Sequence, residues 1–117
     1  MSETLDPEPL ATLDELLATG EVDELVQTFL DGMVERLADL ERALVEGDRV
    51  GAHRAVHTLA SGAASLGAMR VRKLAEGLEL ELLHALPARS GTRATELAHA
   101  CQAARAALIA ARAGRVG

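Results

Sequence analysis

Apolar residues recur at every third or fourth position through four long stretches of this chain. In the first stretch they are Val22, Val26, Phe29, Met33, Leu37, Leu40 and Leu44. Because an α-helix turns once in about 3.6 residues, this spacing places the apolar side chains on one helix face. The pattern predicts long helices over residues 22–45, 49–66, 68–86 and 92–113, preceded by a short helix over residues 9–18.

Glycine and proline separate the predicted helices from one another. Gly20 and Gly47 follow the first two helices, Gly67 follows the third, and Pro87 follows the fourth. Glycine is common just after a helix and proline cannot continue one, so these residues are predicted to end the helices. Asp48, directly after Gly47, is typical of the cap that starts a new helix.

The connections between the predicted helices are short, which makes consecutive helices neighbours that run in opposite directions. The sequence therefore predicts an all-α fold, an antiparallel four-helix bundle with a short extra N-terminal helix. A chain of 117 residues has the length of one domain. We expect this domain over residues 9–113, with flexible segments at residues 1–8 and 114–117.

Composition supports the helical prediction and a cytoplasmic location. Ala and Leu make up 43 of the 117 residues, whereas Phe29 is the single aromatic residue, so a sheet fold is practically excluded. The single cysteine, Cys101, cannot form an internal disulfide, and we expect it to be a small core residue of an intracellular protein. Since we find neither a signal peptide nor a membrane-spanning stretch, we expect no contact with a membrane.

The net charge of −6 is distributed unevenly along the chain. Residues 1–48 contain 14 acids and 2 bases, whereas residues 49–117 contain 4 acids and 10 bases. An acidic chain with one aromatic ring is a poor nucleic-acid binder, so we expect no nucleic-acid partner. The bases between Arg49 and Lys73 predict a local basic surface that suits an acidic partner.

His57 is predicted to lie on the solvent side of the third long helix. The apolar stripe of that helix consists of Ala52, Val56, Leu59, Ala63 and Leu66, and the histidine lies about 140° from its centre. Its neighbours on the helix surface are Val50, His53, Arg54, Ala60, Ser61 and Ala64. A solvated histidine without a role is the simpler interpretation. Small residues on an exposed helix face, however, favour a docking surface.

Residues 57–68 read His-Thr-Leu-Ala-Ser-Gly-Ala-Ala-Ser-Leu-Gly-Ala, and they are followed in the next helix by Val71, Leu74, Leu78 and Glu79. This pattern resembles the signature of histidine-containing phosphotransfer (HPt) domains. The order of helices resembles that family over nearly the whole chain. The resemblance implies a four-helix bundle in which His57 accepts a phosphoryl group from the aspartyl phosphate of a receiver domain and passes it to another receiver.

The sequence departs from the family pattern close to this histidine. Ala60 stands where the family usually has a lysine that helps to neutralise the phosphoryl group, and Ser61 stands where glycine is frequent. Arg54 is three residues before His57 and about 60° around the helix, so we expect it to contact the phosphoryl group together with the Ser61 hydroxyl. A solvated surface charge is the alternative for Arg54. The predicted partner-binding residues are Val50, His53, Ala60, Ala64 and Arg70.

The resemblance assigns the magnesium ion and the acidic pocket to the receiver domain, so we expect no cofactor and no metal in this chain. His53 and His57 have a spacing that could place both on one metal ion, but no third ligand is evident. We predict a monomeric phosphocarrier without its own kinase site. Its expected partners are receiver domains of response regulators or hybrid histidine kinases.

Two other functions remain open at this point. The chain could be an adaptor that binds receiver domains but transfers phosphoryl groups poorly, because Ala60 lacks the usual charge. It could also be a structural module that dimerises through the Ala-rich face of the third helix. An enzyme with its own catalytic cycle is disfavoured, since the sequence has no Gly-rich phosphate loop and no nucleophile beside a base.

Overall fold

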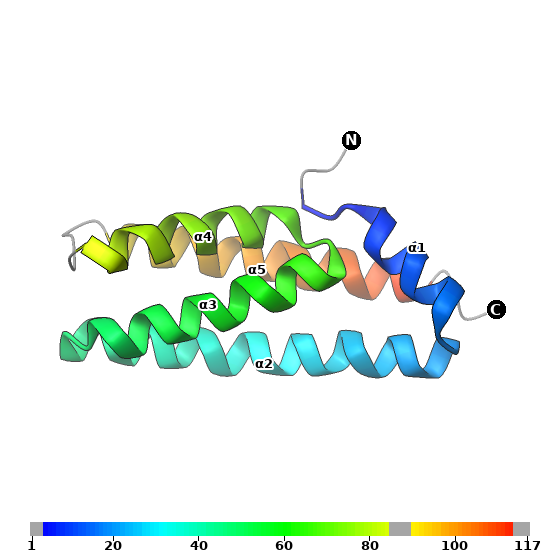
Figure 1. Ribbon diagram of the computed structural model, residues 1–117, viewed down its shortest axis with the longest axis horizontal. Coiled ribbons are helices and arrows are strands. Elements are labelled where there is room, and N and C mark those ends of the chain that lie inside the picture. The colour runs from blue at the N-terminus through cyan, green and yellow to red at the C-terminus, as the bar shows by residue number, and fades with distance from the viewer. Residues whose placement is uncertain (1–3, 85–89, 114–117) are drawn as a thin grey trace.

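The computed structural model describes residues 4–84 and 90–113, and all regular structure within these ranges is helical. Figure 1 shows the long helices side by side, with consecutive helices running in opposite directions and the short helix at one end. The helices are α1 (Pro7–Leu16), α2 (Thr19–Glu46), α3 (Arg49–Leu66), α4 (Met69–His84) and α5 (Ser90–Ala113). The predicted all-α fold is confirmed for these residues.

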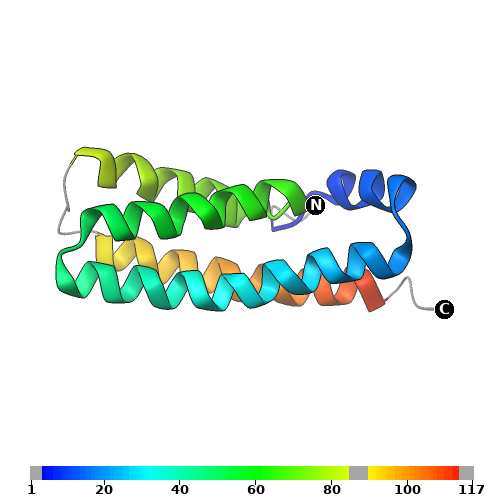
Figure 2. The same cartoon turned by 60° about the horizontal axis from the view of Figure 1, so that its bottom comes forward.

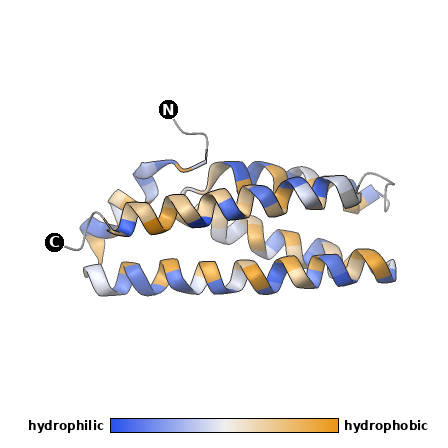
Figure 3. Ribbon diagram, turned by 180° about the vertical axis from the view of Figure 1, so that it is seen from behind, coloured by the Kyte–Doolittle hydropathy of each residue, from blue (hydrophilic) through white to orange (hydrophobic). Residues whose placement is uncertain are grey.

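The four long helices enclose a single core. α3 packs against α2 and α4, and α5 packs against the same two helices, so each long helix has two neighbours. The view in Figure 2, turned by 60°, shows the same arrangement from another side. The short helix α1 contacts α2 and α3. The amphipathic pattern is visible in Figure 3, where hydrophobic and hydrophilic residues alternate along the ribbons.

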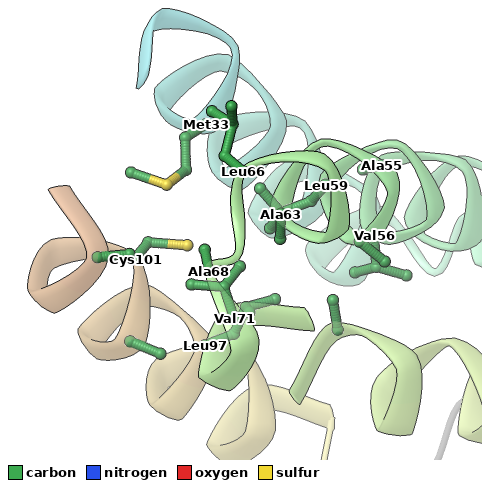
Figure 4. Close-up of a cluster of buried hydrophobic side chains, with 14 of the residues drawn as sticks. Met33, Ala55, Val56, Leu59, Ala63, Leu66, Ala68, Val71, Leu97 and Cys101 are labelled. Atoms are coloured by element: carbon green, nitrogen blue, oxygen red, sulfur yellow. The ribbon is translucent and has the colours of Figure 1, made fainter. Parts of the chain in front are cut away.

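The predicted apolar stripes supply the core, and Figure 4 shows part of it. All five stripe residues predicted for α3 are buried, and they meet α4 and α5 residues such as Val71 and Leu97. Cys101 is buried among them, and burial raises the pKa of its thiol to about 12. The thiol is therefore protonated at neutral pH, and the predicted core role of Cys101 is confirmed.

Two glycines end helices as predicted. Gly47 and Gly67 have φ angles of 72° and 80°, the left-handed conformation that side chains with a Cβ rarely adopt. At the next helix start, the Asp48 carboxylate accepts a hydrogen bond from the backbone N–H of Gly51 at 2.8 Å. Gly67 also approaches the start of α1, since its carbonyl accepts from the backbone N–H of Asp6 at 2.7 Å. The turn at Gly47 fixes the direction in which α3 leaves α2, and the turn at Gly67 fixes the direction in which α4 leaves α3.

The ends of α1 differ from the prediction. Gly20 was expected to stop this helix, but α1 ends at Leu16 and Gly20 lies in the first turn of α2. The chain is extended at Leu17, whose side chain packs against the core, and the Glu21 carboxylate accepts from the backbone N–H of Ala18. Helix α2 therefore begins three residues earlier than predicted. A tertiary contact, rather than the glycine, sets this turn.

The N-terminal boundary of α1 also moves. The helix starts at Pro7, so residues 7 and 8, expected in a flexible segment, are helical. Asp6 caps this start by accepting from the backbone N–H of Glu8, and proline suits the first position of a helix. Of the remaining boundaries, α3 agrees in full, α4 starts one residue later and α5 two residues earlier than predicted. Pro87, the predicted end of α4, lies outside the described residues.

The spacing of apolar residues predicts a buried stripe on α5 made of Leu97, Cys101, Ala104, Leu108 and Ala111, and this prediction is wrong for Ala111. Ala111 is exposed, whereas the neighbouring Arg112 is buried, with 8% of its surface exposed. The Arg112 guanidinium donates to Asp23 of α2 at 2.6 Å and to Asp14 of α1 at 3.0 Å. Burial alone would lower the pKa of Arg112, but the hydrogen bonds to Asp23 and Asp14 raise it, and the net shift is upward. This charged group joins the ends of three helices.

Replacing Arg112 should lower the stability of the whole chain. Arg112→Leu removes the cation that pairs with the buried Asp14 carboxylate, and we expect the free energy of unfolding to fall by about 2 kcal/mol. Urea unfolding followed by circular dichroism measures this change. Arg105→Leu, at an exposed position of α5, is the matched control and should change stability by less than about 0.5 kcal/mol. Equal midpoints for the two variants would contradict the role of Arg112.

Candidate functional site

His57 projects from α3 beside α4, with 63% of its side chain exposed. It is exposed because the apolar stripe of α3 faces the core and the histidine lies well away from that stripe. Its Nδ1 lies 2.7 Å from Oε2 of Glu79 on α4. A carboxylate can only accept a hydrogen bond, so the proton of the neutral ring belongs on Nδ1. The lone pair is then on Nε2.

His53 lies one turn before His57 and completes a cluster with it and Glu79. The two imidazole rings are nearly parallel, with an interplanar angle of 9° and centroids 6.1 Å apart. The His53 Nε2 is 3.5 Å from the same Glu79 oxygen that His57 approaches. The Glu79 side chain is 19% exposed, which limits the water available to compete for it. One carboxylate oxygen therefore faces two imidazoles.

Sequence reasoning placed Glu79 in the family pattern but gave it no role. The residue is 22 positions from His57 and lies on a different helix. Its contact with the histidine depends on the rotation and register of α4 against α3, which apolar periodicity does not specify. The sequence does contain one indication of this role. Glu79 follows Leu78, a core residue of α4, so its carboxylate must lie close to the interface between helices.

The residues around His57 divide between two flanks of α3. By helix geometry, His53 and Ala60 lie on one side of His57, while Arg54 and Ser61 lie on the other, all within about 60°. His53 contacts Glu79 on α4, so the first flank faces α4. Arg54 lines a cavity of about 400 Å³ between α2 and α3, so the second flank faces α2.

Ala60 was predicted to be exposed, and this prediction is wrong. The residue is 8% exposed because it lies on the flank of α3 against which α4 packs. The absence of a long side chain at this position therefore coincides with close contact between two helices. The other predicted partner-binding residues are on the surface, since Val50, Ala64 and Arg70 are exposed and His53 is half-buried.

Arg54 and Ser61, the two residues expected to contact the phosphoryl group, are both exposed. Arg54 shares its cavity with Arg36 and Thr58, away from the Glu79 side of His57. The backbone carbonyl of Ser61 accepts a hydrogen bond from the Ser65 hydroxyl at 3.1 Å. The structure thus brings His53 and Glu79 to His57, and it places Arg54 and Ser61 on the opposite flank.

The small residues in the segment after His57 differ in their environments. A Cβ at Gly62 would lie 2.8 Å from Cδ1 of Phe29, so this glycine lets the phenyl ring of α2 approach α3. Ala63 is buried in the core, whereas Ala64 is exposed. An apolar cavity of about 550 Å³ lies beside Phe29 and Gly62 and extends to Leu66. Part of the Ala-rich run is therefore explained by packing.

No group of three His, Cys, Asp or Glu side chains within residues 4–84 and 90–113 is arranged to hold a metal ion. None of the helices found there has both the length and the apolar character needed to cross a membrane.

Comparison with protein families gives a match to the model of the Hpt domain over residues 24–114, most of the chain. The chain belongs to the Hpt domain family. His57 and Glu79 both lie within the matched residues. No curated protein matches the sequence significantly.

Two solved structures share the fold of this Hpt domain. Histidine-containing phosphotransfer protein B (HptB) from Pseudomonas aeruginosa PAO1 superposes with a TM-score of 0.89 at 24% sequence identity, and 96% of each chain is covered. The HPT domain of a sensor hybrid histidine kinase from Shewanella superposes with a TM-score of 0.79 at 16% identity, and 98% of each chain is covered.

The Glu79 carboxylate should determine which nitrogen of His57 is protonated. In Glu79→Gln the side-chain amide can donate as well as accept, so the preference for a proton on Nδ1 should weaken. Nitrogen-15 NMR of the imidazole ring measures the two tautomers. We expect mainly the Nδ1–H form in the wild type and a mixture in the variant.

Glu76→Gln is the matched control for this experiment. Glu76 lies one turn earlier on α4, is exposed, and pairs with Arg72. This variant should leave the His57 spectrum unchanged. If Glu79→Gln also leaves it unchanged, Glu79 does not set the tautomer.

Proposed function

We propose that this Hpt domain is a phosphocarrier of a two-component phosphorelay. His57 accepts a phosphoryl group from the aspartyl phosphate of one receiver domain and passes it to another. The observation that supports this most is the pairing of an exposed imidazole with a half-buried carboxylate through Nδ1. Such a pair orients the ring and keeps the lone pair on Nε2.

The proposed transfer needs no base. The Nε2 lone pair attacks the phosphorus of the acyl phosphate, so an N–P bond forms while the P–O bond to the aspartate breaks. The aspartate leaves as a carboxylate, and Nδ1 keeps its proton throughout. The ring thereby gains positive charge, and the Glu79 carboxylate, 2.7 Å from Nδ1, stabilises that charge. Transfer to the next receiver reverses these steps.

The remaining charge in the transfer lies on the phosphoryl oxygens. We propose that the receiver domain supplies the magnesium ion and the acidic pocket that hold the reacting phosphoryl group. On this chain, Arg54 and the Ser61 hydroxyl would approach the phosphoryl group from the α2 side of His57. The docking face would include His53 on the α4 flank and exposed residues along α3 and the start of α4, namely Val50, Ala64 and Arg70.

Residues 7–113 would act as one unit, an antiparallel four-helix bundle with α1 added at one end. The chain would be a monomeric carrier in the cytoplasm that depends on a separate histidine kinase for phosphate. Receiver domains of response regulators or of hybrid kinases would be its partners.

One observation favours a second function. Position 60 is occupied by a buried alanine on the α4 flank. An alanine has no charge, so this position provides no cation for a phosphoryl group on His57. The domain would then act as an adaptor that binds receiver domains and transfers phosphoryl groups slowly. Binding of a receiver without labelling of His57 distinguishes this function from the first.

His57 should be the site of phosphorylation. When the chain is incubated with a panel of radiolabelled phosphorylated receivers, we expect acid-labile label on the wild type. His57→Gln should have none, because the lone pair of the amide nitrogen is delocalised into the carbonyl and is not nucleophilic. His99→Gln, at an exposed position of α5, should be labelled like the wild type. Label on the His57 variant, or binding without label on the wild type, would contradict phosphotransfer through His57.

Arg54 should accelerate the transfer if it contacts the phosphoryl group. In Arg54→Ala we expect the rate of transfer from a phosphorylated receiver to fall about tenfold, because a charge-assisted hydrogen bond is lost. Rapid-quench measurements of the labelled chain give this rate. Arg42→Ala, which removes another arginine beside the same cavity, is the control. An unchanged rate and an unchanged phosphohistidine lifetime would remove Arg54 from the mechanism.

A further inference from the structure

His53 has an unusual environment for a surface helix. Its Nε2 is buried and has no hydrogen-bond partner among the described residues. The Glu79 Oε2 is 3.5 Å away, which is longer than an ordinary hydrogen bond. A buried polar nitrogen without a partner is unfavourable, so a small movement of the carboxylate toward His53 is favoured.

His53 lies where it can influence the orientation of the His57 ring. Both histidines belong to α3, one turn apart, and their rings are nearly parallel. Glu79, in contrast, belongs to α4 and reaches across the interface. With His57 as its single partner, the carboxylate could follow any rotation of that ring. A second donor on α3 restricts the carboxylate and therefore restricts the ring.

We infer that His53 is a positioning residue for phosphotransfer, which helps to hold the Glu79 carboxylate oxygen that faces His57. Glu79 then keeps the proton on Nδ1 of His57 and directs Nε2 away from α4. The nearly parallel His53 ring also limits rotation of the His57 ring. His53 touches neither the phosphoryl group nor the incoming receiver aspartate in this role. It acts on the reaction through Glu79.

The cluster also explains why a histidine, rather than another residue, suits position 53. A lysine would bring a fixed positive charge and a flexible chain, and leucine would bring no donor. A glutamine has an amide nitrogen at a similar reach to Nε2 and can donate to the carboxylate. The substitutions His53→Leu and His53→Gln therefore separate the volume of the side chain from its hydrogen-bond donor.

Two measurements test the inference, and the first does not depend on phosphotransfer. Nitrogen-15 NMR of the unphosphorylated chain reports the tautomer of His57. We expect His53→Leu to increase the Nε2–H form and His53→Gln to restore the wild-type spectrum. His99→Leu is the control for loss of an exposed histidine. The amide spectrum of each variant shows whether the fold is kept.

The second measurement is the transfer rate from a radiolabelled phosphorylated receiver, and here the inference rests on the proposed function. His53→Leu should slow the transfer about three- to tenfold, and His53→Gln should recover most of the loss. A wild-type His57 spectrum in His53→Leu overturns the inference, as does equal impairment of both variants. Absence of label on the wild-type chain would refute the proposed function instead, while the NMR result would still decide the role of His53.

Discussion

The packing of α4 against α3 is the interaction on which the site depends. It buries one flank of α3, including Ala60, and brings Glu79 within 2.7 Å of His57. An exposed histidine on an isolated helix would sample both tautomers and several ring orientations. Across this interface, a carboxylate selects one nitrogen for the proton and leaves the other for chemistry.

Contacts of α3 with both of its neighbours explain part of its composition. A Cβ at Gly62 would collide with Phe29 of α2, and Ala60 is buried on the flank that faces α4. The Ala-rich run after His57 is therefore partly a packing requirement and partly an open face around the histidine.

Much of the fold could be predicted from the spacing of apolar residues and the placement of glycine. The bounds of α3 and the caps at Gly47, Asp48 and Gly67 follow from local chemistry, because left-handed backbone and side-chain caps involve only nearby residues. The turn at Gly20 and the α5 stripe at Ala111 could not be predicted in this way. At those two places the structure depends on contacts with residues distant in the sequence, namely the packing of Leu17 against the core and the hydrogen bond from Arg112 to Asp23.

The sequence by itself determined that the chain is helical, that His57 faces solvent, and that its surroundings resemble those of a phosphotransfer histidine. Each of these conclusions depends on the period of one helix or on a contiguous motif. The tertiary structure decided that Glu79 and His53 share the histidine site and that Arg54 lies on the other flank. It also decided that Ala60 is buried. The physical reason is that the relative rotation of two packed helices depends on side chains far apart in the chain, and helical periodicity leaves that rotation open.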